Sequence, residues 1–490
     1  MAFDSSRNLF RAATAFVALL LGAVLAVYWA DFNGEDPKAR RVGPFLATPY
    51  LQLGEVAAPD ALTLLWHADD EDVPWSVEVQ SPSGSAWRSA GKPESRRVIL
   101  DKVEPHRVYR SVLADLAPGL PFRYRVKRAG ISAFEAESKA KPEPGRPHRF
   151  VAFGDCAAGT AGQRKVAFQA HRAKPDFVLI TGDIVYFQGK VGEYRSKYFP
   201  IYAAPEASPA VGAPLLGSTL FVGVPGNHDL MINDFDRSPD LMAYFLFWSQ
   251  PLNGPARAAG GRLAPPLLGA SDRLQAFRDG AGPNYPRMAS FSFDYGDVHW
   301  TILDSNPYVQ WADPDLRAWV AADLASASEK PWRFVSFHHP GFHSSKAHAP
   351  EQQMRLLADL FERGGVSLVF SGHVHNYQRT YPLKFAPRTF ADGHAPEPAT
   401  PVEGTWTLDQ AYDGTSKTRP DGVIYLVTGA GGAKLYDPSQ TEHPETWKPF
   451  TARFKADVHS FTQVDVTPDT ATVRQIDADG ATLDSFTVAR

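Results

Sequence analysis

The chain has 490 residues, 44% of them hydrophobic and 21% charged, which indicates a globular protein of two or three folded units. Its net charge of -4 gives no broad attraction to nucleic acid, so no nucleic-acid scaffold is implied. The single cysteine, Cys156, excludes an intramolecular disulfide and a thiolate metal cluster.

The first predicted element is an apolar segment, residues 12–30. Arg7 and Arg11 precede it and acidic residues follow, an asymmetry that places the remaining chain on the outer side of a membrane. The segment is at the lower length limit for a membrane span, but it is long for the core of a signal peptide. Residues 1–42 are therefore predicted to export the protein, as an uncleaved anchor that associates with the membrane or as a cleaved signal peptide. An anchor is favoured.

Residues 43–138 are predicted to form a small all-β sandwich. Short apolar or alternating runs, such as 62–66 and 76–79, are separated by turn residues at a spacing typical of sandwiches. The stretch 116–124 resembles the late-strand pattern of fibronectin type III domains, although Phe122 stands where that family usually has tyrosine. Because this part shows no catalytic constellation, we expect a packing or spacer module.

After a proline-rich linker, apolar runs each end in a polar cluster. Runs without alternation are typical of strands buried on both faces, and helix-capable stretches such as 161–173 and 351–363 lie between them. This predicts an α/β core with ligand groups at the carboxyl ends of its strands. The runs are 150–153 before Asp155, 177–180 before Asp183, 220–224 before Asn227, 333–337 before His338, and 366–370 before His373.

Two segments interrupt this rhythm, 231–290 and 385–421, and both are predicted to be loops that determine the substrate. The C-terminal part is predicted to form strands joined by turns, one of them the hairpin turn 477–480. These strands are expected at 423–428, 461–466, 472–476 and 482–488.

The strand-end clusters together supply two carboxylates, one carboxamide and three imidazoles. This mixture suits first-row transition metals better than calcium, and it is too large for one four-coordinate zinc. Shared between two metals with one bridging carboxylate, it can support in-line displacement at phosphorus. A single Gly-Asp pair is more often only a turn, but the whole ordered set is hard to explain by packing. The six residues are Asp155, Asp183, Asn227, His338, His373 and His375.

These blocks resemble a known family, the calcineurin-like metallophosphoesterases. A tyrosine three residues after the second aspartate, here Tyr186 after Asp183, resembles the purple acid phosphatase branch. Other branches have a histidine two residues after the first aspartate, and here Ala157 stands at that position after Asp155. The resemblance implies an α/β (α+β) fold over residues 148–490, a four-layer-type β-sandwich flanked by helices. The blocks concerned are 154–155, 182–186, 226–229, 335–338 and 372–375.

The resemblance also implies a ligand set for two metal ions. The first ion, iron(III) because of the phenolate, would be held by Asp155, Asp183, Tyr186 and His375. The second, divalent iron, zinc or manganese, would share Asp183 and be held by Asn227, His338 and His373.

Other polar residues receive separate predictions. His228 is expected to protonate the leaving group or orient the phosphate, and Asp229 to position His228. His348 matches a family position that contacts phosphate, with His343 as a rival on the same loop. His339 follows His338 and should point the opposite way on an extended segment, so its role in substrate binding is open. His299 is expected to be a core histidine.

The sequence thus predicts a hydrolase of phosphomonoesters in which a metal-bound hydroxide attacks phosphorus. Cleavage of phosphodiesters, including phospholipid head groups, at the same site remains an alternative. A non-catalytic cell-surface binding module is an alternative from a different class. The predicted partner is a small phosphate ester, and the oligomeric state is open.

Overall fold

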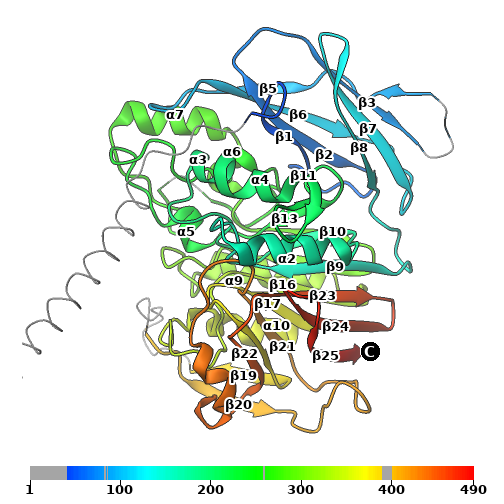
Figure 1. Ribbon diagram of the computed structural model, residues 1–490. Coiled ribbons are helices and arrows are strands. Elements are labelled where there is room, and N and C mark those ends of the chain that lie inside the picture. The colour runs from blue at the N-terminus through cyan, green and yellow to red at the C-terminus, as the bar shows by residue number, and fades with distance from the viewer. Residues whose placement is uncertain (1–40, 82–83, 85, 258–259, 389–399) are drawn as a thin grey trace, which may run out of the picture. The chain divides into compact units, whose positions relative to one another are not determined.

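The structure is a computed structural model that describes residues 41–490, apart from 82–83, 85, 258–259 and 389–399. The predicted export segment, residues 12–30, lies outside the described residues. Within the described part of the chain, no helix has both the length and the apolar character needed to cross a membrane. The described residues form one unit, and two large β-sheets make up most of it (Figure 1).

The larger sheet has ten strands and continues from the N-terminal β-region into the region after residue 148. Its centre is parallel, because β10 pairs in parallel with both β9 and β13. The N-terminal strand β1 joins this centre through the parallel pair Leu51 and Leu220. In sheet order the strands are β25 (Thr482–Ala489), β24 (Thr470–Asp477), β23 (Ser460–Val466), β9 (His148–Phe153), β10 (Phe177–Ile180), β13 (Leu220–Gly223), β1 (Phe45–Gln52), β2 (Leu62–Asp69), β6 (His106–Leu113) and β5 (Glu94–Val98).

The second large sheet has seven strands, of which β15, β16, β17 and β21 are parallel neighbours. Antiparallel strands lie at both of its ends. In sheet order the strands are β14 (Phe291–Tyr295), β15 (Val298–Ile302), β16 (Trp332–Ser336), β17 (Leu368–Ser371), β21 (Ile424–Thr428), β18 (Tyr377–Thr380) and β22 (Thr451–Lys455).

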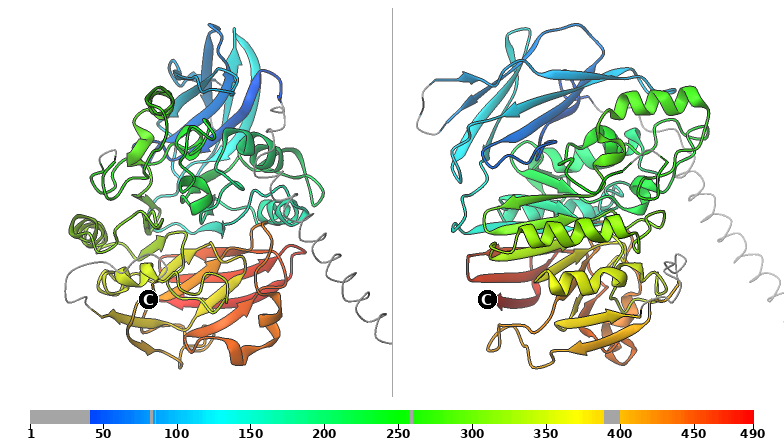
Figure 2. Two further views of the ribbon diagram at one scale, coloured as in Figure 1. Left: turned by 90° about the vertical axis from the view of Figure 1, so that its left-hand side faces the viewer. Right: turned by 180° about the vertical axis from the view of Figure 1, so that it is seen from behind.

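The two sheets pack face to face through aromatic side chains. Phe150 of β9 lies 5.0 Å from Trp300 and 5.6 Å from Phe370, ring centre to ring centre. Alternate residues of β9, such as Val151, point to the other face, where α2 (Ala161–Arg172) covers the sheet. Helices α9 (Pro314–Ser326) and α10 (Ala358–Arg363) cover the outer face of the second sheet (Figure 2). The predicted α/β fold with a layered β-sandwich is confirmed.

A buried ion pair connects the two sheets near the C-terminus. Arg379 of β18 and Asp484 of β25 are 6% and 8% exposed, and they make a two-pronged contact of 2.7 Å (Nε to Oδ2) and 3.2 Å (Nη2 to Oδ1). Because both charges are buried, Arg379 depends on Asp484 for compensation, while Asp484 also accepts a hydrogen bond of 2.9 Å from the Tyr377 hydroxyl and lies 3.6 Å from Arg453 Nε.

The N-terminal region is a small β-domain, as predicted. A four-stranded sheet packs on β1, β2 and β6, with Trp66, Trp75 and Tyr109 among the buried side chains between them. Phe122 is buried there, and the hydroxyl of Tyr124 donates a hydrogen bond of 2.6 Å to the carbonyl oxygen of Gly217 in the following region. The sheet consists of β4 (Arg88–Ser89), β3 (Trp75–Gln80), β7 (Pro121–Arg128) and β8 (Ile131–Lys139).

The two predicted loops contain some regular structure. Segment 231–290 carries short helices whose aromatic residues join the hydrophobic core. Segment 385–421 is partly a hairpin, because β19 (Leu383–Pro387) pairs with β20 (Gly404–Leu408). The remaining elements are α3 (Val191–Glu193), η1 (Tyr194–Tyr198), α4 (Phe199–Tyr202), β11 (Ala203–Ser208), β12 (Gly212–Pro214), α5 (Asn227–Leu230), α6 (Tyr244–Phe247), α7 (Ser271–Ala281), α8 (Asn284–Arg287), η2 (Gln353–Leu357), η3 (Pro438–Glu442) and η4 (Pro444–Thr446).

Candidate metal centre

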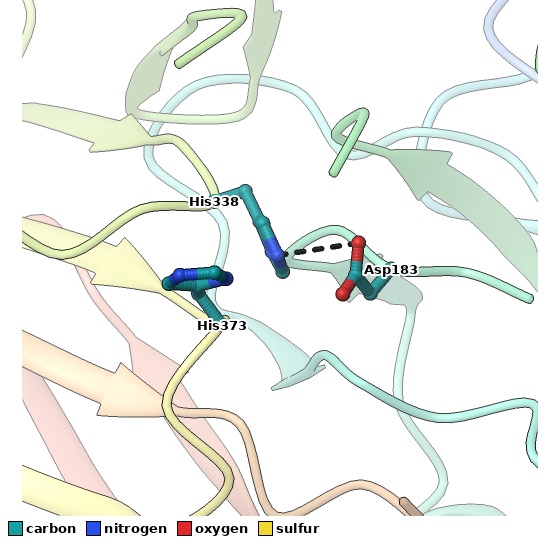
Figure 3. Close-up of side chains that lie close together, drawn as sticks. All are labelled: Asp183, His338 and His373. Atoms are coloured by element: carbon teal, nitrogen blue, oxygen red, sulfur yellow. Dashed lines mark ion pairs between the residues drawn. The ribbon is translucent and has the colours of Figure 1, made fainter. Parts of the chain in front are cut away.

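The carboxyl ends of five strands, three in one large sheet and two in the other, meet at one place. Asp155, Asp183 and Asn227 follow β9, β10 and β13 of the larger sheet. From the second sheet, His338 follows β16, and both His373 and His375 follow β17. Figure 3 shows Asp183, His338 and His373 side by side, and their ligand atoms all lie within 4.8 Å of one another. The fold therefore brings together the six side chains that the strand-end pattern singled out.

Three of these residues have an unusual backbone conformation. Asp155, Asp183 and His373 have φ angles of 57°, 47° and 66°. Positive φ is uncommon for residues other than glycine, and such strain is concentrated at functional sites. The sharp turn after each strand directs the side chain inward, to the point where the two sheets meet.

One group of contacts is centred on Tyr186. Its hydroxyl donates hydrogen bonds of 3.1 Å to Asp155 Oδ1 and 3.2 Å to Asp183 Oδ2, and it lies 3.0 Å from His375 Nε2. His375 Nε2 is also 3.3 Å from Asp155 Oδ1. These four side chains form the set that the resemblance assigned to the first metal.

A second group is centred on His338. Its Nε2 lies 3.3 Å from Asp183 Oδ1 and 3.1 Å from Asn227 Oδ1. Asp183 therefore contacts both groups, with Oδ2 towards Tyr186 and Oδ1 towards His338. A carboxylate in this position can bridge two metal ions.

Backbone carbonyls fix the orientation of two of the histidines. His338 Nδ1 lies 2.8 Å from the carbonyl oxygen of Thr181, and His375 Nδ1 lies 2.6 Å from that of Lys434. Such a bond at one ring nitrogen leaves the other as a lone-pair donor to a metal. His373 differs, because its Nε2 lies 2.7 Å from Glu351 Oε2 and only Nδ1 is then available to a metal.

The two buried carboxylates of the cluster give it a negative charge that suits the binding of metal cations. Asp155 and Asp183 are 0% and 1% exposed, and among the described residues their ion-pair partners are histidines, with no lysine or arginine. Burial by itself would raise the pKa of Asp183, but His338 and His228 outweigh it and the pKa is well below its ordinary value. Burial would lower the pKa of His338, but Asp183 raises it to about 9.

Glycines form a close wall around the two carboxylates. A Cβ atom at Gly226 would lie 2.2 Å from Asp183 Oδ1, and one at Gly372 or Gly429 would lie 2.7 Å from Asp155 Oδ2. The backbone thus approaches both carboxylates more closely than any side chain would allow. The donor set, its burial and this wall together fit a two-metal site.

His228 lies at the edge of the cluster. Its side chain is 29% exposed, its Nε2 is 3.8 Å from Asp183 Oδ2, and its Nδ1 is 2.7 Å from the carbonyl oxygen of Phe187. The ring also packs on Tyr186, with a distance of 4.5 Å between ring centres. His228 can therefore present Nε2 to a molecule that reaches the cluster from solvent.

Asp229 makes different contacts from those predicted. Its carboxylate accepts hydrogen bonds from the backbone N–H groups of Gly226 (2.8 Å) and Ile184 (3.2 Å), where a contact with His228 was expected. The carboxylate thereby ties the loop that carries Asp183 to the loop that carries Asn227. Burial and the charge of Asp183 raise the pKa of Asp229 to about 7.

Of the other predicted histidines, two lie beside the cluster. His339 and His348 lie near His373, with ring centres 4.3 Å and 4.0 Å away, so His339 does not point away from the cluster. His339 Nδ1 lies 2.9 Å from Ser305 Oγ, which also accepts hydrogen bonds from the backbone N–H groups of residues 338 and 339. His343 is buried on the loop that carries His348, and its Nδ1 has no hydrogen-bond partner in the part of the chain that the structure describes.

His299 is buried in β15, away from the cluster. Its Nδ1 lies 2.8 Å from Asp294 and its Nε2 3.1 Å from Asp323. Burial lowers the pKa of His299, but the two carboxylates outweigh it and raise the pKa to about 9.

The sequence analysis missed Glu351. One of its carboxylate oxygens lies 2.7 Å from His348 Nδ1 and the other 2.7 Å from His373 Nε2. Glu351, His339 and His373 also form a second group able to hold a metal ion. Residues 351–363 were assigned to a helix, but the helical part begins at Gln353 and Glu351 lies in the loop before it. Its position three residues after His348 was the available signal.

Comparisons with known proteins agree with this geometry. Residues 148–377 match the family described as Calcineurin-like phosphoesterase. Purple acid phosphatase 21 of Arabidopsis thaliana is 40% identical over 98 residues, which are 19% of this chain and 22% of that protein, so the chain spans about a fifth of this relative. Purple acid phosphatase 23 of the same plant is 24% identical and matches 71% of this chain and 78% of its own length.

Solved structures show the same fold. A purple acid phosphatase from yellow lupin (Lupinus luteus) seeds superposes with a TM-score of 0.62 at 18% identity, covering 91% of this chain and 75% of that one. PhoD superposes with a TM-score of 0.54 at 13% identity, covering 92% and 94%. At these identities the likeness concerns the fold alone.

Proposed function

The chain is a calcineurin-like metallophosphoesterase related to the purple acid phosphatases, and we propose that it hydrolyses phosphomonoesters with two metal ions. The observation that carries this proposal is the position of Asp183, whose two carboxylate oxygens face two separate groups of ligands. A homologous domain over residues 148–377 supports the reaction class.

The ligand assignment follows the two groups. Asp155, Tyr186 and His375 would hold the first ion together with Asp183. Because a phenolate favours a hard trivalent ion, we propose iron(III) for this position and divalent iron, zinc or manganese for the second. The second ion would be held by Asp183, Asn227, His338 and His373. When bound, the pair would lower the pKa of a bound water and hold phosphate oxygens in line for displacement.

The protein's own groups complete the reaction. His228, half-exposed beside Asp183, would protonate the alkoxide that leaves phosphorus. Its bond to the carbonyl oxygen of Phe187 fixes which ring nitrogen faces the substrate. His339 and His348 stand on the other side of the cluster, where they would contact the phosphate.

Phosphodiester hydrolysis is a second candidate that one observation favours. Glu351 adds a carboxylate between His348 and His373, beside the place where the phosphate would bind. A monoester dianion is repelled by this charge more than a diester monoanion is. The balance between the two substrate classes therefore depends on Glu351.

We further propose that residues 1–42 export the protein, either as an anchor or as a cleaved signal, and that the domains comprise residues 43–138 and 148–490. The support for export is the charge asymmetry around residues 12–30. The support for the division is the proline-rich linker between the two domain segments.

The first experiment is a visible absorption spectrum of the purified protein together with elemental analysis. We expect about two metals per chain and a tyrosinate-to-iron(III) band that disappears in Tyr186→Phe. Two metals without the band would refute the iron-tyrosinate assignment, and fewer than one metal after reconstitution would refute the two-metal site.

The second experiment is the substitution His228→Ala, assayed with a nitrophenyl monoester and the matching diester. We expect turnover to fall by about 100-fold or more while the metal content is unchanged. His299→Gln, a histidine in the core of the second sheet, is the matched control. Unchanged behaviour of His228→Ala would instead favour a non-catalytic binding module.

A further inference from the structure

A cavity of about 640 Å³ lies between the N-terminal β-domain and the region after residue 148. Its lining residues come from β1 and β8 of the N-terminal region and from α4 and β11 of the following region. The lining is mostly apolar and includes Phe45, Leu46, Phe134, Phe199 and Ala204. Its volume lies within the range of cavities that bind small organic ligands.

The cavity also contains a buried positive charge. Arg195 of η1 lines it and is 5% exposed, and no described residue hydrogen-bonds its Nε or Nη2 atom. Within the described ranges, Arg195 forms no ion pair. Burial lowers its pKa to about 10, although the charges of Glu104, Asp240 and Asp69 raise it. Burying an unpaired charge is costly, so a partner is expected.

The acidic residues of the lining do not supply this partner. Glu135 and Glu137 are exposed positions of β8, and residues of a strand alternate between faces, so their side chains lie on the face opposite to Phe134 and Ala136. Glu135 is also paired with Arg123 at 3.3 Å. The cavity thus combines an apolar lining with a buried arginine whose Nε and Nη2 atoms have no hydrogen-bond partner among the described residues that line it.

We propose that this cavity binds a single-chain amphiphile with an anionic oxyacid head group. The alkyl chain would lie against the apolar lining, and the carboxylate or phosphonate oxygens would accept hydrogen bonds from Arg195. None of the lining residues belongs to the metal centre, so the site is distinct from the proposed active site and does not depend on the proposed hydrolysis.

The test is calorimetric titration of the full-length, metal-loaded protein with dodecanoate, dodecylphosphonate and dodecanol. We expect both anions to bind at least about tenfold more tightly than the alcohol. Affinity should rise about fourfold with each methylene from octanoate to dodecanoate. A preference for one anion identifies the head group. Equal binding of dodecanoate and dodecanol, or no binding of either anion, would overturn the proposal.

Two substitutions test the two parts of the cavity. Arg195→Met should weaken dodecanoate at least about tenfold and leave dodecanol unchanged, whereas Lys165→Met, an exposed lysine outside the cavity, should alter neither. Ala136→Phe places a larger side chain in the apolar part of the cavity and should weaken the binding of both ligands. Circular dichroism verifies that each variant is folded. Unchanged dodecanoate affinity in folded Arg195→Met, or in folded Ala136→Phe if the arginine variant does not fold, would refute the site.

Discussion

Replacing Gly226 by alanine tests the shared carboxylate with a single methyl group. Gly226 has φ -104° and ψ -174°, an extended conformation that alanine adopts without strain. Its Cβ would lie 2.2 Å from Asp183 Oδ1 and 2.3 Å from the backbone nitrogen of Asp183. The effect of Gly226→Ala is therefore steric and is directed at Asp183.

The size of the effect follows from these distances. Carbon and oxygen atoms that are not bonded stay at least about 3 Å apart, so the carboxylate must move by about 0.8 Å. Metal–ligand distances tolerate only about ±0.2 Å, and a carboxylate displaced by several times that amount loses its place in the coordination. We expect metal affinity to fall at least 10- to 100-fold, the range seen when groups that support metal ligands are removed.

The assay is metal content after dialysis, followed by competition with a chelator, in the wild type and in two variants. Gly280→Ala is the control, because that glycine lies in helix α7 and its Cβ would meet only side-chain atoms, of Leu246 at 3.3 Å and of Val98 at 3.6 Å. The control should keep its metals and gain up to about 1 kcal/mol of stability. Two metals held with wild-type affinity in Gly226→Ala would refute the role of Asp183 as shared ligand.

Three further predictions concern charges. In Glu351→Gln, the ratio of kcat/KM for a phosphomonoester to kcat/KM for a diester should rise about tenfold. An unchanged ratio would show that the charge of Glu351 does not influence the choice of substrate. The pKa of His299 is raised from 6.5 to about 9 in the folded protein, so the protonated imidazole should contribute its full stabilisation of the fold below pH 6.5. This stabilisation, up to about 3 kcal/mol, should be lost as the pH rises through 9. Urea unfolding of His299→Gln should lack this dependence, and a wild-type stability that is flat over the range contradicts it. Arg379→Met should lower the free energy of unfolding by up to about 3 kcal/mol, because it leaves the buried Asp484 carboxylate with only the more distant Arg453, at 3.6 Å, as a cationic partner, and a loss below 1 kcal/mol would contradict this.

The strand ends were predictable from the sequence because buried strands appear as apolar runs and the metal-ligand residues follow these runs directly. Continuous apolar runs before Asp155, Asp183 and His338 predicted strands buried on both faces, and the structure has β9, β10 and β16 at these places. The carboxyl ends of parallel strands meet at one edge of a sheet, so the proximity of Asp155 and Asp183 followed from the strand assignment. The proximity of His338 depends in addition on the packing of the second sheet against the first.

Contacts between distant loops were not predictable in the same way. The partners of Asp229 are backbone N–H groups, at Gly226 and Ile184, and backbone donors have no signature in the residue types. Glu351 was predicted to belong to a helix, but the helical segment in the structure begins two residues later, at Gln353. The helical pattern marks the segment but not the loop that brings its first carboxylate to His373.

The parallel pair between β1 and β13 has a consequence for any attempt to produce the phosphoesterase part alone. Without residues 43–138, Leu220 at the start of β13 would lose its pairing with Leu51, and this edge of the strand would be uncovered beside buried apolar side chains such as Val222. An uncovered strand of this kind is a template for pairing with another chain. We therefore expect the N-terminal β-domain to protect this edge from aggregation, and a fragment that begins near residue 148 to be insoluble at concentrations where the whole protein is not.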